Sequence, residues 1–283
     1  MPETIEQIRE RVKQAQNLYS ENVVLIEAIL QMNRKYVTRI PNKESVVALC
    51  SGGLDSIVMI NSLIENNSAK VYPLFIKRGA RAEKHEENSF DFFIDFYKKR
   101  FPSNIGDGFK LEYKVPPKEF KQYFPKELSL TQGLPLRNST MQNLAVMYAV
   151  SLNGRYNLNI KTIFSASTGD DFIEPEQGLL SLRTQTLSTC VQLGDWDWQI
   201  TSPFTDPNII SENSLGKDYH PIFKRDIIEY AMQNFIPVEK TRTCFSSDLV
   251  ADGTCFACQK RLKAFRELNM EDPLEYKTRE ITI

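Results

Sequence analysis

A short apolar run that leads into two adjacent glycines restricts the fold of this chain more than any other feature. Residues Val46 to Cys50 have the composition of a buried strand, and apolar residues recur at helical spacing soon after them. Gly52 and Gly53 let the backbone between them turn sharply, so that successive N–H groups point inward at the positive end of the helix dipole. The pattern predicts a strand, an oxyanion-binding turn and a helix. A plain turn without a ligand is the alternative.

The side chains of this turn add polar groups to the backbone donors. Ser51 and Ser56 supply hydroxyl groups, and Asp55 supplies a carboxylate suited to a magnesium ion that screens phosphates. No lysine follows the glycines, so the turn is not a Walker A loop, and cleavage at the other end of ATP becomes plausible. The predicted ATP-binding residues of the turn are Ser51, Gly52, Gly53, Leu54, Asp55 and Ser56.

Apolar runs and amphipathic stretches alternate along the chain after Pro41. Further strands are predicted at residues 71–76, 111–115, 160–164 and 198–202. Helices are predicted at residues 55–66, 82–100, 139–152, 178–193 and 224–234. Strands that alternate with helices are typical of a parallel sheet, because each crossover to a parallel neighbour runs through a helix. We therefore expect a doubly wound α/β fold with a parallel sheet.

Two segments depart from this alternation. Residues 4–34 carry one apolar stripe at helical spacing, which predicts a helix that packs on its own domain or contacts another subunit. Residues 205–220 are polar and rich in turn formers, which indicates a surface insertion. The predicted organisation is an N-terminal helical extension at 1–44, a central domain at 45–235 with that insertion, and a C-terminal tail at 236–283.

Charge, cysteine content and hydropathy argue against several classes of protein. The chain has 35 basic and 36 acidic residues and a net charge of −1, so no overall field attracts nucleic acid. Residues 1–11 lack the apolar core of a signal peptide, and no run of 18 apolar residues occurs, so we expect no membrane partner. Five cysteines, three of them close together near the C-terminus, favour a reducing compartment and metal binding over disulfides. We expect a cytoplasmic protein.

The hexapeptide at residues 51–56 resembles the signature of the PP-loop ATP pyrophosphatases, which grip the pyrophosphate part of ATP with it. That class includes amide-forming synthetases, tRNA thiolases and the 7-cyano-7-deazaguanine synthases of the QueC family. Residues 134–138, Leu-Pro-Leu-Arg-Asn, are similar to a Pro-x-Arg-Asn segment of QueC proteins. The resemblance implies that Arg137 and Asn138 lie beside the nucleotide and that Arg137 is also catalytic. A surface salt bridge is the alternative for Arg137.

An acidic segment follows the predicted strand at 160–164, where open α/β sheets bind ligands. QueC proteins carry an aspartate in this region. Asp170 or Asp171 is therefore expected to contact magnesium or the base of the substrate, and Glu174 or Glu176 to accept a hydrogen bond from a purine-like N–H group. A solvated acidic loop is the alternative.

Residues 223–227, Phe-Lys-Arg-Asp-Ile, are similar to the Ser-Lys-x-x-Ile helix start of the family, whose lysine reaches the phosphates. The resemblance implies that Lys224 is catalytic together with Asp55 and Arg137. Phe223 stands where the family has serine, and a lysine on the helix surface is the alternative.

The C-terminal cysteines resemble the zinc motif of QueC proteins, in which one cysteine precedes Cys-Gly-x-Cys-x-x-Cys-x-x-Arg and four thiolates hold a structural zinc ion. When the two are aligned on Arg261, Cys244, Cys255 and Cys258 match three of the ligands, and Asp252 stands where the second cysteine should be. Zinc also accepts carboxylate oxygen, so the resemblance implies a zinc site with three sulfur ligands and one oxygen ligand. Three ordinary cysteines or a redox pair are the alternatives.

One family motif is largely absent. QueC proteins carry Tyr-Gly-Gln-Arg-His after the second strand, whereas residues 78–82 read Arg-Gly-Ala-Arg-Ala. Arg78 and Arg81 remain as candidates for substrate contacts. This departure, the additional N-terminal helix, the insertion at 205–220 and Asp252 make the chain more similar to the diverged QueC-like proteins of anti-phage systems such as type IV CBASS and Qat. In those proteins a deazaguanine can be joined to a protein amine.

The resemblance implies an enzyme that uses ATP and Mg²⁺ to adenylate a carboxylate of the 7-carboxy-7-deazaguanine type, with release of pyrophosphate, and that passes the acyl group to an amine. It also implies a structural Zn²⁺ ion. The expected partners are the deazapurine and a protein acceptor from the same defence system, with a homodimer as a further option. The alternatives are a housekeeping synthase that uses ammonia, a tRNA thiolase and a non-catalytic nucleotide-binding scaffold.

Overall fold

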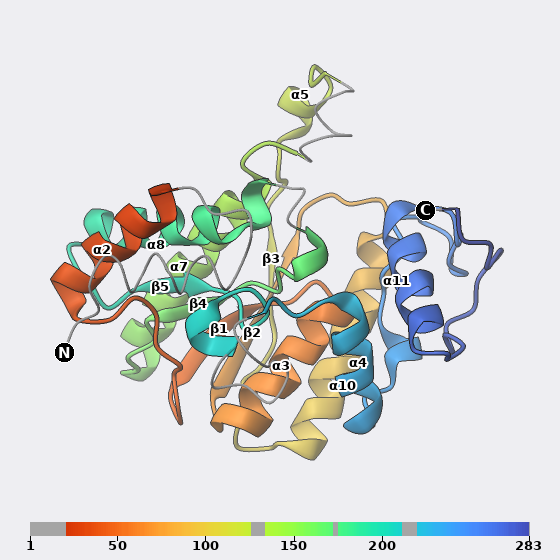
Figure 1. Cartoon of the computed structure of the whole chain (residues 1–283), viewed down its shortest axis with the longest axis horizontal. Coiled ribbons are helices and arrows are strands. Elements are labelled where there is room, and N and C mark those ends of the chain that lie inside the picture. The colour runs from red at the N-terminus through yellow and green to blue at the C-terminus, as the bar shows by residue number, and fades with distance from the viewer. Residues whose placement is uncertain (1–20, 126–133, 172–174, 211–219, 283) are drawn as a thin grey trace.

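The computed structural model describes residues 21–125, 134–171, 175–210 and 220–282 (Figure 1). Its elements are, in chain order, α2 (Glu21–Arg34), β1 (Ser45–Leu49), α3 (Leu54–Asn67), β2 (Lys70–Lys77), α4 (Glu83–Arg100), β3 (Phe109–Glu112), α5 (Lys118–Lys121), α7 (Arg137–Tyr156), β4 (Thr162–Phe164), η1 (Gly169–Asp171), η2 (Pro175–Gln177), α8 (Leu179–Leu193), β5 (Gln199–Thr201), α9 (Pro207–Ile210), α10 (Lys224–Gln233), η3 (Val238–Lys240) and α11 (Phe256–Glu267). In these ranges, every helix is too short or too polar to span a bilayer.

The strands form a five-stranded parallel sheet in the order β3-β2-β1-β4-β5. β1 lies in the middle and pairs with β2 from Ser45 opposite Lys70 to Leu49 opposite Leu74, and with β4 on its other side. The chain first adds strands on one side of β1 and then on the other, so its direction of winding changes between β1 and β4. Ligands of such sheets bind at this switch point, beyond the carboxyl ends of the strands. The predicted doubly wound α/β fold is confirmed.

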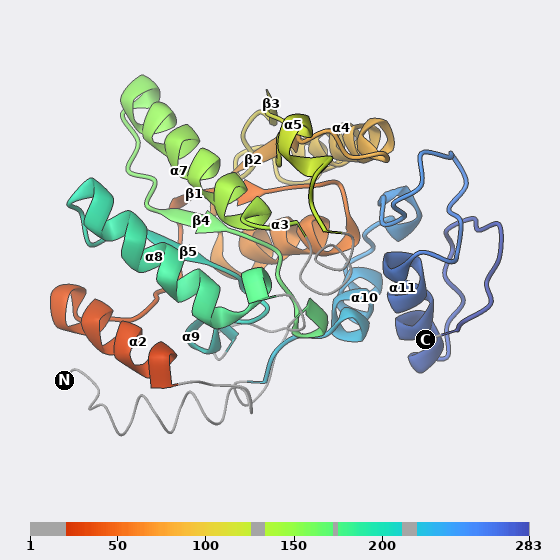
Figure 2. The same cartoon turned by 90° about the horizontal axis from the view of Figure 1, so that it is seen from above.

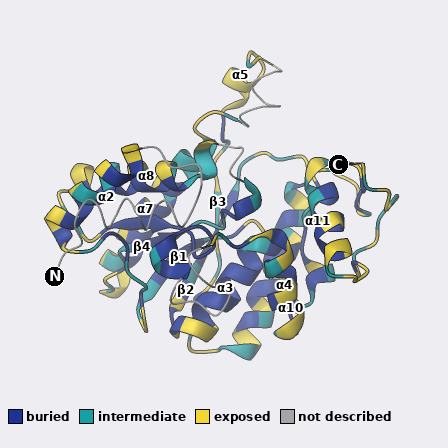
Figure 3. Ribbon diagram, viewed as in Figure 1, coloured by how far each residue is buried: buried dark blue, intermediate teal, exposed yellow. Residues whose placement is uncertain are grey.

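Helices cover both faces of the sheet, α7 and α8 on one face and α3, α4 and α10 on the other (Figures 1 and 2). β1 shows why its sequence is apolar throughout: Val46 and Ala48 point into one core, and Val47 points into the other. β1, β4 and β5 are accordingly almost wholly buried, whereas the edge strand β3 has no buried residue and α5 projects from the molecule with exposed residues (Figure 3). Two cores hold the carboxyl ends of the strands in fixed positions.

A buried ion cluster joins α2 to the body of the protein. Arg183 of α8 is 1% exposed and donates from Nε to Glu27 of α2 at 2.7 Å and from its two terminal nitrogens to Asp206 at 2.6 and 2.9 Å. Thr201 also donates to Asp206, at 2.6 Å. Residues 21–34 therefore pack on their own domain, one of the two options for the predicted N-terminal helix. Residues 4–20 of that helix lie outside the described part of the chain.

The prediction of a surface insertion at residues 205–220 is wrong for its first part. Thr205 and Asp206 are buried, and α9 follows with Ile209 and Ile210 packed in the core. The sequence predicted a loop because the polar residues of this segment are common in turns. Asp206, however, is buried as the counter-ion of Arg183. Residues 211–219 lie outside the described part of the chain.

The ion cluster predicts a loss of stability in acid. Burial opposes the ionisation of Asp206, but the Arg183 guanidinium, together with hydrogen bonds from Thr201 and Asn208, lowers the pKa of Asp206 from 3.8 to about 2. Because the folded pKa is below the unfolded one, this stabilisation is complete above about pH 4 and is lost as the pH falls towards 2. We expect a fall of about 2 kcal/mol in the free energy of unfolding over this range from Asp206 alone, measured by urea unfolding.

The variant Asp206→Asn should lack this part of the pH dependence, whereas Asp95→Asn, which changes an exposed aspartate of α4, should retain it. Equal slopes for Asp206→Asn and the wild-type protein would contradict the assignment.

Candidate active site

The turn after β1 is held in a conformation that only glycine accommodates. Gly52 has a φ of +73°, and a Cβ atom at this position would lie 2.4 Å from the carbonyl oxygen of Glu86. The Gly52 carbonyl accepts hydrogen bonds from the Ser89 hydroxyl at 2.7 Å and from the Arg242 N–H at 2.9 Å. Two segments that are distant in the sequence, α4 and the chain after η3, therefore fix the turn.

The serines of the turn form a small hydrogen-bond network at the start of α3. The Ser56 hydroxyl donates to the Gly53 carbonyl at 3.0 Å and accepts from the Ser51 N–H at 3.3 Å. Gly53 is the N-cap of α3, and among the described residues no side chain caps this helix end. The first N–H groups of α3 and its positive dipole end are thus available to an oxyanion.

A buried ion pair lies at the mouth of this turn. Lys224, the first residue of α10, is 7% exposed, and its ammonium group donates to Oδ2 of Asp55. Burial alone would lower the pKa of Lys224, but the carboxylates of Asp55, Asp171 and Asp170 raise it. Burial raises the pKa of the Asp55 carboxyl, and Lys224 opposes this shift. The alternative of a lysine on the helix surface is therefore excluded. Lys224 directs its ammonium group at the turn of residues 51–56, which we call the phosphate turn.

Only one of the two carboxylate oxygens of Asp55 pairs with Lys224. Its Oδ1 atom is buried and has no hydrogen-bond partner among the described residues. An ionised carboxylate oxygen in this situation is costly unless a ligand binds it. Magnesium prefers such oxygen ligands, so Asp55 fits the predicted magnesium ion, and Asp171 lines the same space.

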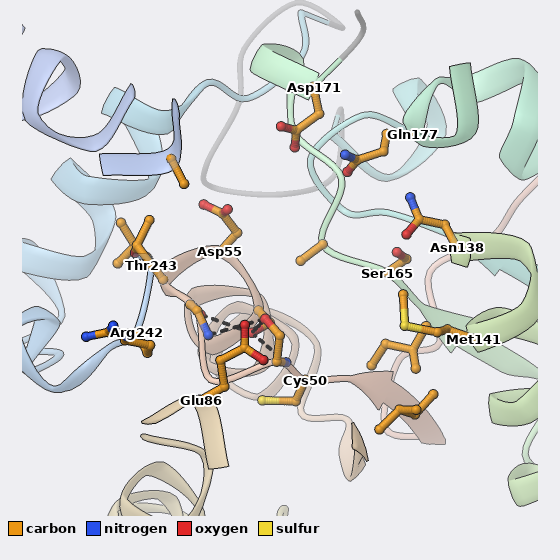
Figure 4. A pocket seen from close by; sticks show the side chains of 18 of the residues that line it. Cys50, Asp55, Glu86, Asn138, Met141, Ser165, Asp171, Gln177, Arg242 and Thr243 are labelled. Atoms are coloured by element: carbon orange, nitrogen blue, oxygen red, sulfur yellow. Dashed lines mark hydrogen bonds between the residues drawn. The ribbon is translucent and has the colours of Figure 1, made fainter. Parts of the chain in front are cut away.

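These groups face a pocket of about 310 Å³ beyond the carboxyl ends of the strands. One wall is mainly apolar and comes from β1, β2 and α7: Leu49, Leu74, Ile76 and Met141. The opposite wall comes from α11 and the chain before it: Arg242, Thr243, Phe245, Phe256, Ala257 and Lys260. The phosphate turn lies between the two walls, with Asn138 and Met141 on one side and Arg242 and Thr243 on the other (Figure 4).

Most of the site residues predicted from the sequence meet at this pocket. Those that line it are Ser51, Gly53, Leu54, Asp55, Ser56, Arg78, Arg137, Asn138, Asp171 and Lys224. The others lie nearby or outside. Gly52, within the turn, is buried and does not line the pocket, and Asp170 accepts a hydrogen bond from the Lys224 N–H at 2.5 Å. Arg81 is exposed and lies outside the pocket lining, just before α4 begins.

The two arginine candidates of the pocket differ in their surroundings. Arg78 forms two hydrogen bonds, of 3.0 and 2.9 Å, with the buried carboxylate of Glu86. Arg137 begins α7, where the Asn138 N–H donates to Glu176 at 3.2 Å. Glu176 thus caps a helix beside the pocket instead of lining it. Glu174, the alternative to Glu176, lies outside the described residues.

The sequence did not predict the wall made by α11. Phe245, Phe256 and Lys260 line the pocket, as do Glu86, Ser165 and Gln177. Phe245 and Phe256 directly follow the cysteines Cys244 and Cys255, and Lys260 directly precedes Arg261 of the same motif. The sequence signal that could have identified these pocket residues is their position inside the candidate metal motif.

The four predicted zinc ligands come together next to this wall. One ligand atom from each of Cys244, Asp252, Cys255 and Cys258 lies within 4.8 Å of the others. A tetrahedral zinc ion, with bonds of about 2.0–2.3 Å to oxygen and sulfur, fits a group of this size and composition. In the described residues, all five cysteines of the chain are free, so a disulfide between cluster members is not formed.

Two arginines support the cluster from outside. Arg261 of α11 is fully buried, binds Asp272 at 2.6 and 2.9 Å and donates to the Thr241 hydroxyl at 2.6 Å. The Arg242 side chain donates to backbone carbonyls of residues 244–249. Because the Arg242 backbone also holds Gly52, the cluster and the phosphate turn share one anchoring residue.

Comparison with known proteins agrees with these features. Residues 219–269 match the model of the family described as queuosine biosynthesis protein QueC. A 7-cyano-7-deazaguanine synthase of Chloroherpeton thalassium is 28% identical over 244 residues, covering 82% of this chain and 97% of the relative. One of Caldicellulosiruptor saccharolyticus is 24% identical over 247 residues, covering 81% and 94%. The chain is a distant homologue of the 7-cyano-7-deazaguanine synthases.

The part of this QueC-like chain that matches the family model contains Lys224 and the four residues of the metal cluster. Among solved structures, NMN synthetase from Francisella tularensis aligns with a TM-score of 0.44 and 12% identity, covering 90% of this chain and 88% of the other.

Proposed function

We propose that this QueC-like protein is an ATP-dependent synthase that adenylates a carboxylate on a 7-deazaguanine-type ring and then passes the acyl group to an amine. Pyrophosphate leaves in the first step and AMP in the second. The observation that carries the proposal is the buried pair of Lys224 and Asp55 at the mouth of a glycine turn that caps α3. The homologous enzymes are named 7-cyano-7-deazaguanine synthases, which supports the choice of the ring.

The geometry supports cleavage between the α and β phosphates of ATP. The α3 N-terminus and the turn hydroxyls suit the pyrophosphate part, and the Lys224 ammonium neutralises charge that develops as pyrophosphate leaves. Magnesium, when bound through Asp55, would screen the phosphate charge. The pocket then holds the acid next to the α-phosphorus and excludes water from the mixed anhydride.

We propose a protein amine as the acceptor, as in the QueC-like proteins of anti-phage systems. The motif Tyr-Gly-Gln-Arg-His of the synthases is replaced at residues 78–82, and Arg78 there is engaged with Glu86. Replacement of this motif near the pocket supports a change of the amine acceptor, while the ATP site is retained. The housekeeping alternative, with ammonia as the amine and a nitrile as the product, differs in this second step only.

One incubation tests the proposal. The purified protein receives ATP, magnesium and 7-carboxy-7-deazaguanine, with and without ammonia, and AMP, pyrophosphate and the deazaguanine products are quantified. We expect pyrophosphate release that depends on the acid and no nitrile. When an acceptor protein is co-expressed, we expect AMP together with a deazaguanine mass adduct on that protein. Nitrile formed with ammonia would support the housekeeping alternative. ADP and orthophosphate as products, or no effect of the acid, would refute the proposal.

A further inference from the structure

We propose that Phe245, Phe256 and Lys260 form the subsite for the acid that is activated, and that this acid is a planar heteroaromatic carboxylate. The inference rests on the proposed function, because it requires ATP on the phosphate turn. It assigns the recognition of the acid to the pocket wall that is formed by α11 and the metal cluster.

Two aromatic rings stand half exposed in this wall. Phe245 and Phe256 are each 50% exposed and both line the pocket. Exposed phenylalanine rings that face a cavity lose water contacts when a flat ring stacks on them. Stacking of a base-like ring on an aromatic side chain typically strengthens binding about 10-fold or more and requires only a planar π-face.

The metal cluster positions both rings. Phe245 follows Cys244, and Phe256 follows Cys255, so each ring is one residue away from a cluster member. Arg242 further holds the backbone of residues 244–249 through its guanidinium group. A subsite on so constrained a backbone is preorganised, which lowers the entropic cost of ordering it on binding.

Lys260 gives the wall a cation. It lies one helical turn after Phe256 on α11, and its Nζ atom is 4.4 Å from the centroid of the Phe256 ring. The ammonium group donates to the Asp170 carbonyl at 2.7 Å and approaches Asp171 at 3.4 Å. An ammonium has three N–H donors, so these two contacts leave one for an anion in the pocket. A flat ring with a carboxylate substituent satisfies both the aromatic rings and this donor.

The wall lies on the correct side of the phosphate turn for the reaction. Arg242 and Thr243 are separated from Asn138 and Met141 by the turn and Asp55 (Figure 4). The apolar wall of β1, β2 and α7 suits adenine, which leaves the α11 wall for the acid. From there a carboxylate oxygen bonds to the α-phosphorus while the bond to the oxygen that bridges to the β-phosphate breaks. Pyrophosphate leaves with that electron pair, and the acyl adenylate remains.

The experiment measures binding of two probes without ATP, by calorimetry, and then acid-dependent AMP formation. The probes are 7-carboxy-7-deazaguanine and 7-deazaguanine, which lacks the carboxylate. Phe256→Ala should weaken binding of both probes about 10-fold, and Phe256→Leu, which keeps an apolar side chain, should weaken it less. Lys260→Met should weaken binding of the acid about 10-fold but leave binding of 7-deazaguanine unchanged.

The control variant is Phe120→Ala, which removes an exposed phenylalanine from α5, outside the pocket. Zinc content is measured for every variant, because a lost cluster would mimic a lost subsite. In the AMP assay, Phe256→Ala and Lys260→Met should raise KM for the acid and leave KM for ATP unchanged.

If the wild-type protein forms acid-dependent AMP but these variants bind the acid like Phe120→Ala, the subsite is wrong while the proposed function stands. A rise of KM for ATP in Phe256→Ala would place adenine on this wall and would also overturn the inference. If the wild-type protein forms no AMP but binds the acid through Phe256 and Lys260, the subsite stands while the proposed function fails.

Discussion

Replacement of Asp55 by asparagine is expected to lower the rate of AMP formation about 10²–10³-fold while the fold is retained. The reason is that the buried Oδ1 of Asp55 has no partner in the described residues and fits a cation, and Oδ2 holds the Lys224 ammonium. An amide cannot hold a divalent cation with the same charge, and loss of one electrostatic contact to a transition state typically costs this much. The measurement is acid-dependent release of AMP and pyrophosphate at saturating ATP.

Glu65→Gln is the matched control for this variant. Glu65 lies at the other end of α3 and pairs with Arg100 at 2.8 Å on the surface. It should keep wild-type activity, and circular dichroism should show that both variants are folded. AMP production by Asp55→Asn at the wild-type rate would remove Asp55 from the catalytic group.

Replacement of Cys258 by serine should reduce the affinity for zinc by at least 100-fold. Cys258 is fully buried and contributes one of the four clustered donor atoms. Groups that only support a ligand already contribute about 10–100-fold in affinity, so loss of a ligand itself should exceed this. Because metal binding contributes directly to folding free energy, the midpoint of thermal unfolding should fall as well. Elemental analysis of the purified protein gives the metal content, and calorimetry gives the midpoint.

Cys190→Ser provides the comparison. The Cys190 thiol donates to the Trp198 carbonyl at 3.2 Å in the core far along the chain from the cluster, and a hydroxyl group can make the same bond. This variant should bind zinc like the wild-type protein. If Cys258→Ser holds as much zinc as Cys190→Ser, Cys258 is not a zinc ligand and the cysteines at residues 244–258 are ordinary thiols.

Features that depend on local sequence could be predicted closely. The strand at Val46 to Cys50, the glycine turn and the following helix are all in place, because a glycine pair between an apolar strand and a helix permits few conformations. The prediction of the third strand is less accurate, because the strand was expected at 111–115 and is found at Phe109–Glu112. That strand lies at the edge of the sheet and is not fully buried, so its apolar signal is weak.

Features that depend on distant contacts could not be predicted. Arg183 meets Glu27 because α2 packs on α8, and it meets Asp206 because β5, which Asp206 follows, also contacts α8. Nothing in the spacing of the three residues indicates this. Asp206 and α9 were consequently mistaken for part of a surface loop. Phe245 and Phe256 are apolar residues whose exposure to a pocket follows from the placement of α11. The sequence motif located the metal ligands but not what their neighbours face.

The bond from the Arg242 N–H to the Gly52 carbonyl links two points 190 positions apart in the chain. The turn at Gly52 can therefore reach its final conformation only after the chain has been synthesised as far as Arg242 and has folded back onto β1 and α3. A chain that ends before Arg242 would lack this anchor of the turn at Gly52.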